Sequence, residues 1–90
     1  MRFQAPFDDV QYAAALETHR RMRANLNQLR RKFPPTTFTT ARLLKRYRDL
    51  IQEFARQLRV PRGKINPRKL NELSDQMVKT FADYVEARND

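Results

Sequence analysis

The chain has no cysteine and no tryptophan, and among its 90 residues it has one glycine and one histidine. Without cysteine there is no disulfide framework and no thiolate metal site. A single histidine, His19, excludes a histidine-rich metal cluster, and a single glycine, Gly63, excludes a glycine-rich phosphate-binding loop. The sequence therefore predicts a protein that holds neither a metal nor a cofactor.

Long apolar runs are missing as well. No apolar stretch approaches the roughly 18 residues that a membrane-spanning helix requires. The N-terminal stretch MRFQAPFDDV lacks the apolar segment of a signal peptide. We therefore expect a soluble, cytoplasmic protein that does not enter a membrane.

Nothing in the sequence suggests an active site. Ser74 is the only serine, and no histidine lies near it in the chain. The adjacent acids Asp8 and Asp9 are explained by the start of a helix, where a cap and a negative charge are both favourable. We therefore expect no catalytic residues and a protein that is not an enzyme.

The charge is strongly positive and unevenly distributed. Lys and Arg outnumber Asp and Glu by 19 to 10, which gives a net charge of +9. Residues 18–69 contain 16 basic and 2 acidic residues, whereas both ends of the chain are weakly acidic. A concentrated basic segment indicates a polyanionic partner, most often nucleic acid. Fourteen of the basic residues are Arg, which suits phosphate contacts but which a GC-rich coding sequence would also favour.

Apolar periodicity and capping residues predict a first helix over about residues 9–33. Asp8 is a good N-cap and Gln11 follows three residues later, as in a capping box. Apolar or aromatic positions recur at alternating steps of three and four, which forms a seam suited to a bundle or a dimer. The seam comprises Tyr12, Ala15, His19, Met22, Leu26, Leu29 and Phe33.

Two further helices are predicted over residues 40–59 and 67–88. Pro34 and Pro35 end the first helix, and Thr39 is the expected N-cap of the second, with Phe38 packing on Leu43. The apolar stripe of the second helix comprises Leu43, Leu44, Tyr47, Leu50, Ile51, Phe54 and Leu58. Asn66 and Pro67 suit the start of the third helix, whose stripe comprises Leu70, Leu73, Met77, Phe81, Tyr84 and Val85.

These elements predict an all-α fold in one domain over residues 1–90. Residues 1–7 are expected to form a flexible arm, although Phe3 and Phe7 have the character to pack against the helices. Short connections favour antiparallel neighbours. The expected architecture is an elongated three-helix bundle, alone or completed as a helical homodimer through the seam of the first helix.

The loop over residues 59–69 is basic, carries no acid, and leads into the start of the third helix. Unpaired backbone N–H groups at a helix start favour an anion. We therefore place the phosphate-contacting surface on the second helix and this loop, although a solvated turn explains the same charges. The candidate binding residues are Arg42, Lys45, Arg56, Arg59, Arg62, Lys64, Arg68 and Lys69.

Residues 51–65, IQEFARQLRVPRGKI, resemble the core of a bacterial helix-turn-helix. The matching positions are Ala55, Leu58, Val60 and Ile65. The resemblance implies a recognition helix entering the major groove of DNA and opened by Pro61, Arg62, Lys64 and Asn66. The sequence departs from the pattern at Arg59, which replaces the usual turn glycine, and at Pro67, which would interrupt the recognition helix.

The sequence therefore predicts a small basic helical protein that binds nucleic acid, DNA before RNA, in a regulatory or architectural role. The alternative is a helical adaptor or inhibitor whose basic face docks on an acidic protein partner. Peripheral binding to an anionic membrane ranks last, because the apolar stripes are needed for a core.

Overall fold

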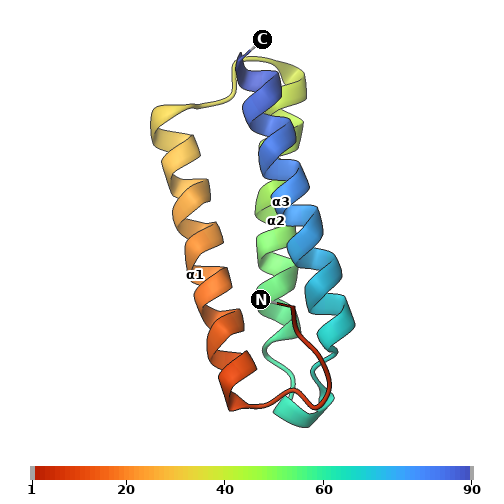
Figure 1. Cartoon of the computed structure of the whole chain (residues 1–90). Helices are drawn as coiled ribbons and strands as arrows, with labels where there is room; N and C mark the ends of the chain where they lie inside the picture. Colours follow the sequence, from red (N-terminus) through yellow and green to blue (C-terminus); the bar gives the residue numbers. More distant parts are fainter. Residues whose placement is uncertain (1, 90) are drawn as a thin grey trace.

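The computed structural model describes residues 2–89, and Figure 1 shows their three helices. These are α1 (Asp9–Lys32), α2 (Phe38–Gln57) and α3 (Pro67–Asn89), and the turn between α2 and α3 contains a short 3-10 helix, η1 (Arg62–Lys64). The described part of the chain contains no β-strand, so the predicted all-α three-helix bundle is confirmed. It is elongated, with principal extents of 43 × 19 × 19 Å.

The helices run up, down and up, and their connections lie at opposite ends of the bundle (Figure 1). The α1–α2 connection lies beside the C-terminal end of α3, whereas the N-terminal arm and the α2–α3 connection share the other end. None of the described helices has the length and hydropathy needed to cross a lipid bilayer.

The core is built mainly by α2 and α3, which pack closely against each other, while α1 approaches α2 at fewer positions. Of the helix residues, α1 contributes three buried apolar side chains: Ala15, Leu26 and Leu29. The buried apolar residues of α2 and α3 are Leu44, Tyr47, Leu50, Ile51, Phe54, Leu70, Leu73, Met77 and Tyr84. The stripes predicted for the second and third helices therefore largely face the core.

The start of α2 differs from the predicted one. The N-cap is Thr37, whose side chain accepts a hydrogen bond from the backbone N–H of Thr40, while the Thr40 side chain accepts one from the Thr37 N–H. The helix therefore begins at Phe38 rather than at Thr40, and it ends at Gln57 rather than at residue 59. Phe38 is 79% exposed, so the predicted contact between Phe38 and Leu43 does not anchor the start of this helix. Thr37 and Thr40 together form a capping box. The prediction missed it because it relied on a hydrophobic contact to locate the start of the helix.

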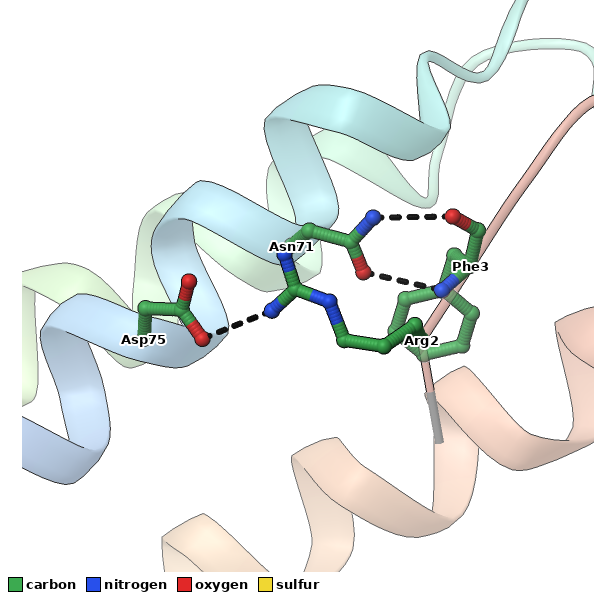
Figure 2. A network of polar contacts seen from close by, with 4 residues as sticks. All are labelled: Arg2, Phe3, Asn71 and Asp75. Carbon is green, nitrogen blue, oxygen red and sulfur yellow. Dashed lines mark hydrogen bonds and ion pairs between the residues drawn. The ribbon is translucent and has the colours of Figure 1, made fainter.

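The N-terminal arm also differs from the expected flexible segment. Figure 2 shows Phe3 held against α3 by the side chain of Asn71 and Arg2 paired with Asp75. The Phe3 side chain is 4% exposed and belongs to the core. An apolar anchor with paired backbone groups fixes the arm, whereas the expectation considered only its local sequence. Residue 1 lies outside the described residues.

The seam predicted on the first helix is used within one copy of the chain. Ala15, Leu26 and Leu29 are buried in the bundle core, and Tyr12 and Met22 pack against it. Phe33, at the end of the seam, is exposed. The buried seam positions therefore offer no surface to a second copy, and dimerisation through them would require the bundle to open.

Candidate functional site

A groove lined by five arginines runs between α1 and α2. Arg23 and Arg30 come from α1, Arg48 and Arg56 come from α2, and Arg59 lies two residues after the end of that helix. None of the described residues that line this groove is acidic. The groove has a volume of about 450 Å³. We call it the arginine groove.

Helical spacing explains why these side chains gather along the groove. Residues four, seven and eleven positions apart lie on one side of a helix. On α1 this spacing joins His19, Arg23 and Arg30, and on α2 it joins Arg48, Gln52 and Ala55, with Arg59 continuing the same side just past the helix end. Arg23 and Arg30 are two turns apart, or about 10.5 Å along the helix. The two stripes form the walls of the arginine groove.

The floor of the groove keeps the two helices together. Leu26 and Ile51 are buried, and both also belong to the core of the bundle. Asn27 and Gln52 add side-chain amides to the walls. Apolar packing therefore sets the relative positions of the two helices that carry four of the groove arginines.

Two of the five groove arginines are paired with an acidic side chain. Arg56 forms an ion pair with Glu53, and Arg48 lies 3.2 Å from the carboxylate of Asp49. Arg23, Arg30 and Arg59 form no ion pair with any residue between positions 2 and 89. The groove therefore has a net positive charge.

Arg48 has a further unsatisfied group. Its Nε atom is buried and has no hydrogen-bond partner among the described residues. A buried donor without a partner costs about 1–3 kcal/mol. Because this atom is buried, the unpaired donor is a local cost to the fold and not an exposed part of the groove.

The pKa of His19 is affected by the positive charge of the arginine groove. Burial lowers the pKa of its imidazole below the ordinary value, and the positive charges of Arg23 and Arg59 lower this pKa further. Both arginines and His19 line the arginine groove. A negative charge bound there would oppose this effect and favour the protonated imidazole.

The structure brings only Arg56 and Arg59 of the predicted binding residues into the groove. Arg42 and Lys45 line a separate shallow hollow nearer the start of α2. Lys45 is 3.3 Å from Asp49, and the Arg42 guanidinium lies 5.7 Å from the centre of the exposed Phe38 ring. These two residues therefore belong to a different part of the surface.

The start of α3 is less available to an anion than the sequence suggested. The backbone N–H groups of Arg68 and Lys69 donate to the side chain of Asn66, at 3.0 and 3.4 Å. The donors expected to attract a phosphate are therefore already capped. Lys64 is exposed on η1, which also lies outside the arginine groove.

Arg62 contacts the beginning of α1 instead of presenting an unpaired charge. Its guanidinium forms an ion pair with Asp9 and lies 4.2 Å from the centre of the Tyr12 ring. Both partners belong to the first turns of α1, so Arg62 attaches η1 to the beginning of that helix. The sequence interpretation missed this contact because the residues are more than 49 positions apart.

The helix-turn-helix interpretation is wrong. That motif joins two helices at about 90–120° through a short turn, whereas α2 and α3 pack against each other as neighbours in the bundle. Arg62 and Lys64 lie on η1, and Pro61 and Asn66 flank it rather than opening a recognition helix. Arg59 also avoids the left-handed conformation of the motif, because no non-glycine residue described here has a positive φ.

Arg23, Arg30 and Arg48 are groove residues that the sequence interpretation left out of the candidate site. Their signal was present in the recurring basic positions on one side of each helix. The sequence did not indicate that the two basic stripes face a common groove. Comparisons with protein-family models, curated protein sequences and solved structures gave no match to this chain.

Proposed function

We propose that this protein binds nucleic acid by placing backbone phosphates in the arginine groove. The observation that supports the proposal is the convergence of five arginines, four from α1 and α2 and one from the turn after α2, on a groove with no acidic residue among its described lining. Arginine presents a planar set of donors that matches the oxygens of a phosphate. The role is binding, in a regulatory or architectural setting, without catalysis.

Electrostatics explains how such a groove would give useful affinity. Each phosphate that an arginine neutralises releases condensed counterions from the nucleic acid. Three to five such contacts would give a slope of roughly −2 to −4.5 in a plot of log affinity against log salt concentration.

The proposal moves the binding surface from the loop to the α1–α2 face. It keeps Arg56 and Arg59 and adds Arg23, Arg30 and Arg48. It leaves out Arg62, which does not line the arginine groove and which pairs with Asp9. The loop contributes mainly through Arg59, at its first position.

Fluorescence anisotropy with labelled single-stranded and duplex DNA at several salt concentrations tests the proposal. The double variant Arg23→Ala with Arg59→Ala should lose at least about tenfold in affinity and flatten the salt slope by 1–2. The matched control is Arg42→Ala with Arg46→Ala, which removes the same charge outside the groove. This control should change affinity by less than about threefold.

Two results would contradict the proposal. Equal losses in both double variants would mean that net charge, rather than the arginine groove, attracts the nucleic acid. If the unmodified protein does not bind either probe at about 50 mM salt, nucleic acid is not the ligand. An acidic protein partner would then be the explanation to pursue, by capture from nuclease-treated extracts.

A further inference from the structure

The arginine groove is continuous with a second, more apolar hollow. The two share His19, Ala55 and Arg59. The remaining lining residues of the hollow are Tyr12, Leu16, Leu58, Val60 and Arg62. A ligand that follows the arginines toward the end of α2 therefore meets an apolar surface directly after Arg59.

Part of this apolar surface is not used by the protein core. Leu16 is 46% exposed and Val60 is 40% exposed, and neither belongs to the buried cluster. They come from different elements, Leu16 from α1 and Val60 from the turn after α2. An exposed apolar lining that adjoins a basic groove is typical of a site for an amphipathic ligand.

One wall of the hollow contains an aromatic ring with a cation over it. Tyr12 supplies the ring and Arg62 the guanidinium, which lies 4.2 Å from the ring centre. Because Asp9 pairs with Arg62, this wall adds little net charge to the hollow. The arginine groove thus provides charge, whereas the adjoining hollow provides apolar and aromatic surface.

We propose that the ligand is a single-stranded nucleic acid, with its backbone in the arginine groove and an unpaired base in the hollow. This inference rests on the proposed function. In a duplex the bases are paired and stacked inside the helix, so a base cannot enter the hollow next to its own phosphate. A single strand offers a charged backbone and an apolar base together, which is the combination used by single-strand binding proteins. The hollow has a volume of about 470 Å³, within the usual range for small organic ligands.

The test compares three probes with equal numbers of phosphates: a single-stranded oligonucleotide, an abasic strand of the same length and a duplex. The single strand should bind at least about fivefold more tightly than the abasic strand, because only the former can place a base in the hollow. The duplex should bind more weakly than the single strand at the same salt concentration.

A double variant and a matched control test whether the base binds in the hollow. Leu16→Gln with Val60→Gln keeps the charge and should lower single-strand affinity to about that of the abasic strand, without changing abasic binding. The control is Val10→Gln with Val78→Gln, which alters two exposed apolar residues outside the hollow. Far-ultraviolet circular dichroism verifies that both variants fold, and the comparison of probes on the unmodified protein needs no variant.

The outcomes separate this inference from the proposed function. Equal affinity for the single strand and the abasic strand would overturn the base-binding inference but leave phosphate binding in place. Tighter binding of the duplex than of the single strand would also overturn the base-binding inference and leave phosphate binding in place. Absence of binding to all three probes would overturn the proposed function itself.

Discussion

Asn71 on α3 holds the backbone of Phe3 through two reciprocal hydrogen bonds. The Asn71 side-chain oxygen accepts from the Phe3 N–H and its amide nitrogen donates to the Phe3 carbonyl, both at 2.8 Å (Figure 2). The side-chain amide thus pairs with the arm as a neighbouring backbone would. This contact lets the Phe3 ring enter the core without leaving its own backbone groups unpaired.

Replacing Asn71 with Ala should reduce the free energy of unfolding by about 1–3 kcal/mol, because both partly buried backbone groups of Phe3 would lose their partner. Urea denaturation monitored by circular dichroism measures the change. Gln76→Ala removes an exposed amide from the same helix and is the control. A loss below about 0.5 kcal/mol for Asn71→Ala would show that the arm contributes little to stability.

The two aromatic residues Phe3 and Phe38 should differ sharply in their contribution. Phe3→Ala removes a side chain that is 4% exposed, and should cost about 3–5 kcal/mol through lost burial and a new cavity. Phe38→Ala alters a side chain that is 79% exposed, so its effect should stay within about 0.5 kcal/mol. Equal urea midpoints for the two variants would mean that the arm is not packed in solution.

The cap of α2 can be located by comparing two threonines. Thr37→Ala removes the side chain that accepts from the Thr40 N–H and should cost about 1 kcal/mol. Thr39→Ala changes an exposed residue inside the first turn and should be nearly neutral. Thermal or urea denaturation distinguishes the two, and a larger loss for Thr39→Ala would place the helix start where the sequence alone suggested.

Stability should fall as the pH is lowered from about 7 to 5.5 because of His19. Its pKa is below the ordinary 6.5 in the folded protein, owing first to burial and then to Arg23 and Arg59. The unfolded chain therefore takes up a proton more readily over the interval between the two values, which favours unfolding as the pH decreases.

The variant His19→Gln checks this pH dependence. As His19 is the only histidine, its replacement should remove most of the change in urea midpoint between pH 7 and 5.5. The lowered pKa values of Glu17 and Asp49 affect stability only at more acidic pH, because their carboxyls are already ionised in this interval. An unchanged pH dependence in His19→Gln would contradict the assignment.

The positions of the helices followed from local signals in the sequence. Apolar residues at helical spacing, caps such as Asp8 and Asn66, and the prolines between helices are read from neighbouring residues. The error at the start of α2 had a local cause, because the prediction placed the cap at Thr39 and did not consider the pairing of Thr37 with Thr40. The arm was misjudged because its anchor, Asn71, lies 68 residues away from Phe3.

The sequence by itself determined the number of helices and the side of each helix that is apolar or basic, because periodicity along one chain segment sets these properties. The tertiary structure decided which basic sides meet, bringing Arg23 and Arg30 to the same groove as Arg48 and Arg59. It also paired Arg62 with Asp9 and removed it from the candidate site. The physical reason is that the rotation of one helix relative to another depends on how all the core side chains fit together, and no single helix carries that information.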